Sequence, residues 1–252
     1  MRALRFLSAG MLLFASVSGA QTAANHVTLG DKEYVAMNAA AAFGHYEAAL
    51  ASGPKDYEAL WKASRSAVDL GTYEKDEETR GLLYRKAELY ARRAVETNPN
   101  DAEGRFNLAR ALGKNALTQG PRSRIKYATD VRSHALECLK LNPRHAGCLH
   151  VMGMWNAEVM RLNGFTRLLA KNLLGGRVFG SASWADAQRY MEESVASEPD
   201  RIVHHVDLGE IYKDVGNKAK ARAEFEAALK LPLADYNDRQ YKAQADAGLR
   251  SL

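Results

Sequence analysis

The chain of 252 residues carries 35 Lys and Arg against 30 Asp and Glu, a formal net charge of +5. Without the first twenty residues, which hold two arginines and no acid, 33 basic residues face 30 acidic ones and the net charge falls to +3. Such balanced, interspersed charges exclude the concentrated basic face of a nucleic-acid-binding protein, so we expect no nucleic-acid partner.

Residues 1–20 have the three regions of a secretory signal peptide. Arg2 and Arg5 precede the apolar run FLSAGMLLFASVSGA, which is too short to span a bilayer and ends in small residues. We expect cleavage after Ala20 and export to the periplasm of a Gram-negative bacterium, with an uncleaved anchor as the alternative. Residues 21–38 are then expected to form an N-terminal linker.

One helix-ending pattern recurs four times along the remaining chain. Small or apolar residues at steps of four and three lie on one helical stripe, and a proline five residues later ends the helix. The copies are Ala42, Tyr46, Ala49 and Pro54; Ala87, Ala91, Ala94 and Pro99; Val131, Ala135, Cys138 and Pro143; and Ala187, Met191, Ser194 and Pro199. Because a lone amphipathic helix of this length is marginal in water, the units must stack, which is typical of a solenoid.

A fifth copy, residues 202–232, shows a complete unit. It has Leu208, Gly209 and Tyr212 on a first helix, a turn at Val215-Gly216-Asn217, and Ala221, Phe225 and Ala228 on a second helix before Pro232. This order matches the tetratricopeptide pattern, except that the proline comes one residue early. The sequence therefore predicts an all-α fold, a tetratricopeptide-repeat right-handed superhelical solenoid.

The predicted repeat domain covers residues 39–252. Its five aligned prolines are 45, 44, 56 and 33 residues apart, whereas a standard unit has about 34 residues, so three units carry insertions between their helices. We expect a partial repeat at 39–54, full repeats at 57–99, 102–143, 146–199 and 202–232, and a C-terminal helix at 235–250.

The largest insertion, residues 161–183, predicts a basic amphipathic helix that Gly175-Gly176 ends. Its apolar face holds Phe165, Leu168, Leu169 and Leu173, while Arg167 and Lys171 lie elsewhere. Such a helix can pack on the solenoid, lie on an anionic membrane or close over a groove, and the pattern leaves all three open.

The order of these segments resembles the regulator of microtubule dynamics family of tetratricopeptide proteins. Its most specific pieces are LNPRHAGCLHVMGMW, followed by the long insertion, and the turn LGEIYKDVGNKAKA. The likeness covers roughly residues 40–250 and implies the repeat fold and a capacity to bind phospholipid. We identify the chain as an exported bacterial member and do not carry microtubule regulation over, because a periplasm holds no tubulin.

The expected ligand-binding groove lies on the first helices, which line the concave side of tetratricopeptide arrays. Its residues are Phe106, Arg110, His150, Met154, Val206 and Glu210. An apolar floor with a few charges suits an amphipathic peptide or an acyl chain. We therefore expect a non-enzymatic module that holds a partner protein or peptide, and the alternative is a phospholipid-binding or lipid-transfer protein that uses groove and insertion together.

Cys138 and Cys148 are the only two cysteines. One ends a second helix and the other begins the next first helix, two places that face each other in stacked repeats. A disulfide and a pair of buried thiols are equally compatible with that placement.

The histidines do not have the spacing of a metal site. His204 and His205 are adjacent and point to different faces of a helix, and His145 and His150 lack the one-turn spacing of paired ligands. We expect His150 to line the groove and the other histidines to be solvated. No nucleophile elbow, phosphate loop or paired-carboxylate motif is found, so we expect no catalysis, metal or cofactor.

Overall fold

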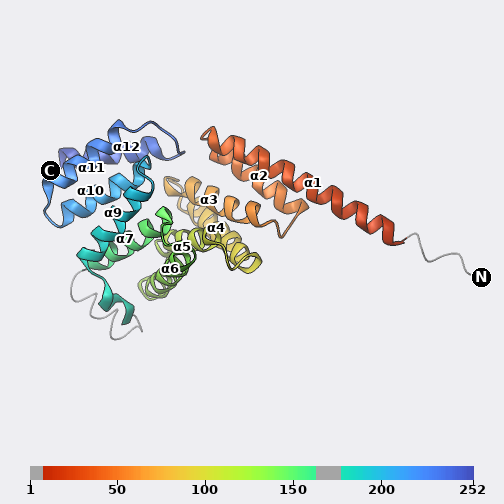
Figure 1. Ribbon diagram of the computed structural model, residues 1–252, viewed down its shortest axis with the longest axis horizontal. Coiled ribbons are helices and arrows are strands. Elements are labelled where there is room, and N and C mark those ends of the chain that lie inside the picture. Colours follow the sequence, from red (N-terminus) through yellow and green to blue (C-terminus); the bar gives the residue numbers. More distant parts are fainter. Residues whose placement is uncertain (1–7, 163–176) are drawn as a thin grey trace, which may run out of the picture.

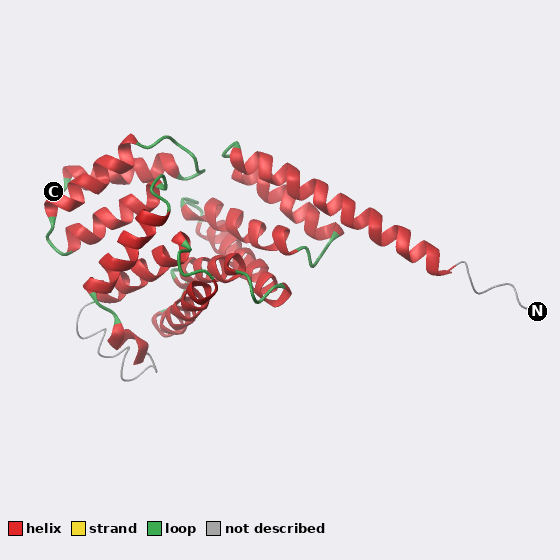
Figure 2. Cartoon of the chain, in the orientation of Figure 1, coloured by secondary structure: helices red, strands yellow, loops and turns green. Residues whose placement is uncertain are grey.

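The computed structural model describes residues 8–162 and 177–252, which form helices and short turns without any strand (Figures 1 and 2). The helices are α1 (Ser8–Val35), α2 (Ala39–Ser52), α3 (Tyr57–Thr72), α4 (Glu77–Thr97), α5 (Ala102–Ala116), α6 (Pro121–Leu141), α7 (Ala146–Arg161), α9 (Trp184–Ser197), α10 (Ile202–Asp214), α11 (Lys218–Lys230) and α12 (Asp238–Arg250), with a 3-10 helix, η1 (Arg177–Ser181).

These helices form five antiparallel pairs that stack in chain order. The pairs are α1 with α2, α3 with α4, α5 with α6, α7 with α9, and α10 with α11, and α12 covers the last pair. The predicted tetratricopeptide solenoid is thereby confirmed.

The repeated prolines end the second helices as expected. The helices α2, α4, α6, α9 and α11 all end two residues before their prolines, and in each the residue between is extended or nearly so. A proline restricts the residue before it and offers no N–H to continue the helix. Side-chain caps begin the helices that follow: Asp56 accepts from the Ala59 amide and Asp101 from the Glu103 amide.

The first pair differs from the expected linker and partial repeat. Residues 21–35 are helical and belong to α1, which packs along α2. Ala23 and Val27 are buried in the N-terminal core, and Gly30 lies directly under Tyr46 of α2. The sequence pattern missed this helix because it lies before the first proline of the alignment.

A close helix approach recurs in four pairs, among them α3 with α4, where a Cβ atom on Gly71 would lie 2.6 Å from the Tyr84 ring. A Cβ atom on Gly30 would lie 2.5 Å from the Tyr46 ring, and one on Gly209 would lie 2.6 Å from the Phe225 ring. Gly153 takes the same place opposite Met191. A glycine on the first helix therefore makes room for the largest side chain on the stripe of the second, which fixes how closely each pair packs.

The predicted amphipathic face of Phe165, Leu168, Leu169 and Leu173, with Arg167 and Lys171, lies outside the described residues. The end of the insertion packs on the solenoid: Phe179 is 3% exposed and its ring stacks on Trp155 at 5.9 Å. In the described part of the chain, no helix combines the length and the apolar character that crossing a bilayer would require.

Candidate functional site

Ion pairs connect successive first helices along the concave side, which we call the inner face (α1, α3, α5, α7 and α10). Lys62 of α3 lies 2.8 Å from Asp31 of α1, and Arg110 of α5 lies 2.5 Å from Asp69 of α3. Further along, His150 of α7 lies 2.7 Å from Asp207 of α10. The inner face is therefore charged, and the charges named here are paired with one another within the chain.

The Asp69–Arg110 pair lies at the centre of the inner face. The Asp69 side chain is only 2% exposed and that of Arg110 is 19% exposed. Burial alone would lower the pKa of Arg110, but the Asp69 carboxylate, together with Tyr241 and Tyr34, raises it. Lys114, one turn further along α5, has a lowered pKa because of burial and the nearby Arg110 charge.

The six residues of the expected groove occupy separate environments. Arg110 and His150 belong to the ion pairs just described. Phe106 packs on the His145 ring at 5.0 Å and on Gly147, whereas Met154 packs against the C-terminal core.

Val206 and Glu210 face the space between α10 and α12, where a shallow cavity of about 460 Å³ is found. Val206 is only 1% exposed, and Glu210 pairs with Lys213 at 2.7 Å. The sequence did not predict these separate contacts, because helix periodicity gives the face of a side chain but not its partner on the next helix.

A loop that the sequence reasoning missed closes the inner face. Asp235, between α11 and α12, pairs with Arg201 at the start of α10 and lies 3.3 Å from the Tyr34 hydroxyl of α1. Tyr34 also lies 3.1 Å from the Asp69 carboxylate, and Asn237 donates to the Asp69 carbonyl oxygen at 3.0 Å. Figure 1 shows this loop directed at the end of α1.

Aromatic side chains add to this closure. The Tyr241 ring of α12 meets the Tyr73 ring, just after α3, edge to face at 5.9 Å. Burial raises the pKa of Tyr73 to about 12 and, together with Asp69, that of Tyr34, so both hydroxyls stay protonated donors. The sequence signal was the acidic turn LADYND, whose partners lie up to 201 residues away.

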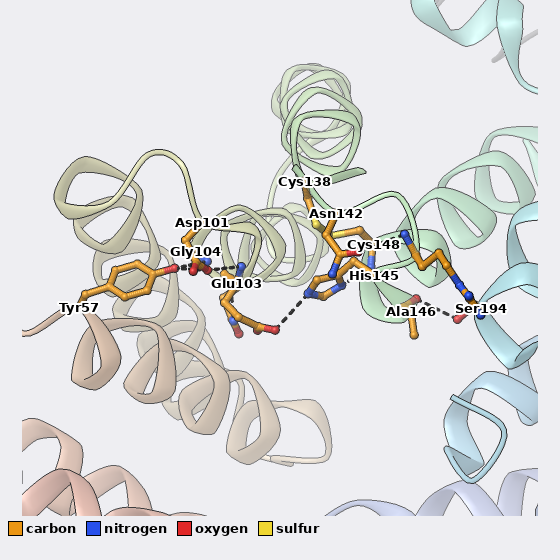
Figure 3. Close-up of a disulfide and its surroundings, with 12 residues drawn as sticks. Tyr57, Asp101, Glu103, Gly104, Cys138, Asn142, His145, Ala146, Cys148 and Ser194 are labelled. Carbon is orange, nitrogen blue, oxygen red and sulfur yellow. Dashed lines mark hydrogen bonds and ion pairs between the residues drawn. A yellow bond between two sulfur atoms is a disulfide. The ribbon is translucent and has the colours of Figure 1, made fainter. Parts of the chain in front are cut away.

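The junctions between successive units repeat with a spacing of ten residues. The pairs are Ala49 with Ala59, Ala94 with Gly104, Cys138 with Cys148, and Ser194 with His204. The third pair forms a disulfide with Cα atoms 6.4 Å apart (Figure 3). Of the two alternatives, a disulfide and a pair of buried thiols, the structure therefore has the disulfide. In the fourth pair, Ser194 Oγ lies 3.2 Å from His204 Nδ1.

His145 completes the disulfide junction. Its Nδ1 accepts from the Cys148 amide and caps α7, and its Nε2 lies 3.1 Å from Glu103 (Figure 3). Cys138, His145 and Cys148 have the donor types of a metal site and lie within 4.8 Å of one another. The sulfur atoms are bonded to each other, however, and offer no thiolate to a metal.

The expectation that the histidines other than His150 are solvated is wrong for two of them. His204 is 3% and His205 is 8% exposed. Burial, together with the charges of His150 and Arg201, holds the pKa of His204 well below its ordinary value. His205 has a raised pKa: burial alone would lower it, but a 2.7 Å hydrogen bond to Glu224 and one to the Pro199 carbonyl oxygen, with nearby acidic charges, together raise it.

A family model described as regulator of microtubule dynamics protein 1-3 matches residues 27–252. The chain belongs to this family. Regulator of microtubule dynamics protein 1 of Bos taurus is 27% identical over 203 residues, covering 79% of this chain and 62% of the bovine protein. The same protein of Mus musculus is 26% identical over 200 residues, covering 79% of this chain and 65% of its own length. The chain thus spans less than two thirds of these family members.

Comparison with solved structures supports the fold of this family member. A thermophilic TPR protein of Thermus thermophilus superposes with a TM-score of 0.62 at 23% sequence identity. The match covers 89% of this chain and 99% of that protein. At this identity the likeness shows the tetratricopeptide-repeat fold alone, so the function has to be argued from the inner face.

Proposed function

We propose that this family member is an exported, non-enzymatic scaffold that binds a segment of a partner protein on its inner face. The observation that carries the proposal is that the inner face already holds a segment of polypeptide, the loop around Asp235 and Asn237. That loop is bound through Arg201, Tyr34 and the backbone of Asp69. A surface that binds one irregular peptide through side chains and main chain has the chemistry to bind another.

The polarity of the inner face favours a peptide over an acyl chain. Desolvating the Asp69–Arg110 and His150–Asp207 pairs against a hydrocarbon tail would leave their charges without water or new partners, which is costly. A peptide supplies donors and acceptors of its own. We therefore place the protein partner ahead of the phospholipid alternative.

Two observations support export. The disulfide between Cys138 and Cys148 is of the kind that forms and persists in oxidising compartments such as the periplasm. The first twenty residues also have the charge and apolar pattern of a signal peptide. Cleavage after Ala20 would leave residues 21–35 as the helix that packs on α2.

The test is to select peptides from a random display library against the purified full chain and to measure their affinities by fluorescence anisotropy. Lys114→Gln, on the inner face, is expected to weaken selected peptides about tenfold, or roughly 1.4 kcal/mol. Lys126→Gln is the matched control, because Lys126 is an exposed lysine of α6. Peptides that respond equally to both substitutions, or to neither, would contradict binding on the inner face.

Native mass spectrometry of the chain purified from a periplasm tests the lipid alternative directly. A mass without bound lipid is the expected result, because the ion pairs of Asp69 with Arg110 and of His150 with Asp207 make the inner face a poor site for an acyl chain. Phospholipid retained at a fixed ratio would instead favour the lipid carrier.

A further inference from the structure

The loop and helix start that close the inner face, residues 231–241, are called here the closing segment. Its two sides differ in chemistry. Leu231, Leu233 and Tyr241 pack on the C-terminal core, which anchors the segment to α10 and α11. Toward α1 and α3 its contacts are mainly polar: the carboxylate of Asp235 and the side-chain amide of Asn237.

The segment presents the Asp235 carboxylate in a fixed position. Asp238 Oδ2 accepts from the amides of Ala234 and Asp235 at 2.8 and 2.7 Å, and Asp235 Oδ1 accepts from the Tyr236 amide at 2.8 Å. The carboxylate is thereby oriented before it meets Arg201. An acidic group held by an arginine and a tyrosine hydroxyl is a recognition geometry rather than apolar packing.

One buried polar atom of the closing segment has no hydrogen-bond partner in the closed arrangement. Asn237 is 2% exposed, and its Oδ1 is buried without a hydrogen-bond partner. A buried acceptor of this kind destabilises the closed form, and it regains water when the segment leaves. Because a few polar contacts and one ring contact, Tyr241 on Tyr73, hold the segment to α1 and α3, and one of its acceptors is unpaired, the closure is suited to exchange.

We propose that the closing segment is a resident ligand of the inner face, and that the partner segment is an acidic peptide that displaces it by placing a carboxylate between Arg201 and Tyr34. This inference rests on the proposed function and adds the partner's chemistry and its competition with the chain. The resident segment is tethered, so it has a high effective concentration and lowers the apparent affinity of any free peptide. Weakening the contacts of the resident segment therefore raises the apparent affinity of the partner peptide.

The experiment uses the full chain and a fluorescein-labelled peptide of its own closing segment, LPLADYNDRQY. Asp235→Asn in the chain removes the charge that Arg201 holds but keeps the size of the side chain. This variant is expected to bind the peptide at least about tenfold more tightly than the wild type, because more of its inner face is open. Asp246→Asn is the matched control: Asp246 is an exposed acid on α12 that pairs only at the surface, with Arg250.

Two further measurements define the mechanism. The same peptide with Asp235→Asn is expected to lose binding to the Asp235→Asn chain, because the carboxylate is the recognised group. Spin labels on cysteines introduced at the exposed Ala40 and Ala243 report the distance between α2 and α12. A second, longer distance is expected in the Asp235→Asn chain and not in the Asp246→Asn chain.

Equal peptide affinity for the wild-type and Asp235→Asn chains, or an unchanged distance distribution, would overturn the resident-ligand proposal. If library-selected peptides still respond to Lys114→Gln in that case, inner-face binding stands and only the competition fails. If those peptides ignore Lys114→Gln, the proposed function itself fails. The two failures are thereby distinguished.

Discussion

The side-chain amide of Asn237 donates a 3.0 Å hydrogen bond to the carbonyl oxygen of Asp69, which precedes it by 168 residues. This contact brings the segment that follows the last helix pair against α3, the first helix of the second pair. It places a buried amide next to the ion pair that connects α3 and α5. Recognition and stability therefore depend on the same part of the molecule, and the predictions below separate them.

Removing one member of the central ion pair should be strongly destabilising. Asp69→Asn leaves the Arg110 guanidinium largely buried without its carboxylate, and we expect the free energy of unfolding to fall by about 3 kcal/mol. Lys140→Ala breaks the exposed pair with Glu137 and should cost less than about 0.5 kcal/mol. Urea unfolding of both variants measures the difference, and similar losses would show that Asp69 is better solvated than its burial indicates.

The disulfide should contribute stability without setting the fold. Cys138→Ala with Cys148→Ala opens a short loop and is expected to lower the free energy of unfolding by about 2–3 kcal/mol. Alanine or glycine occupies the equivalent positions of two other junctions, so the helices should remain packed. The far-UV circular dichroism spectrum should therefore match that of the wild type. A variant that loses its helical signal at room temperature would contradict this.

Two glycines inside helices should respond to alanine in opposite directions. Gly209→Ala places a Cβ atom 2.6 Å from the Phe225 ring and is expected to cost about 1–3 kcal/mol. Gly44→Ala, inside α2 with open space around it, should stabilise the chain by about 0.5–1 kcal/mol. Thermal unfolding of the two variants provides the comparison. A neutral Gly209→Ala would mean that the helix pair can separate at little cost.

Acidification should destabilise the fold through His204. Its folded-state pKa lies well below the ordinary value of 6.5, mainly because the side chain is buried. Just below about pH 6.5 the histidine is therefore protonated in the unfolded chain but still neutral in the folded chain. The stabilising contribution is complete above about pH 6.5 and is lost as the pH falls below it. His205 has the opposite sign: its raised pKa gives a contribution that is present below about pH 6.5 and is lost as the pH rises.

The free energy of unfolding of the wild type and of His204→Gln, measured in urea from about pH 7 to about pH 5, tests this assignment. Glutamine keeps a hydrogen-bonding group near Ser194 but does not titrate. The variant should lose less stability than the wild type over this range. Parallel losses in both chains would assign the acid sensitivity to other groups.

Local rules were sufficient to predict the repeated helices. The prolines at 54, 99, 143, 199 and 232 predicted where the second helices end, and the small residues on their stripes predicted which faces are buried. These features depend on residues within one or two turns of each other. The helix before residue 39 was missed because it has no proline to align.

The inner face was beyond those rules. Pairings such as Asp69 with Arg110, or Tyr34 with Asp235, depend on how tightly the solenoid curves, which is the sum of small rotations between units. We also expected His204 and His205 to be solvated, whereas the packing of α10 against α9 and α11 buries them. The sequence therefore predicted the units, and the charged surface became visible only when they were stacked.

Closure between the first and last units also changes how the array can deform. An open solenoid behaves as a spring, because it stretches by small rotations at every interface between units. An end unit frays when it loses its packing against a single neighbouring unit. Here Tyr34 of the first unit and Asp69 of the second are hydrogen-bonded to the segment that follows α11. Extending the array or fraying either end therefore first requires these hydrogen bonds to break. Mechanical extension should therefore begin with one discrete step, in which the closure breaks, followed by gradual elongation like that of an open solenoid.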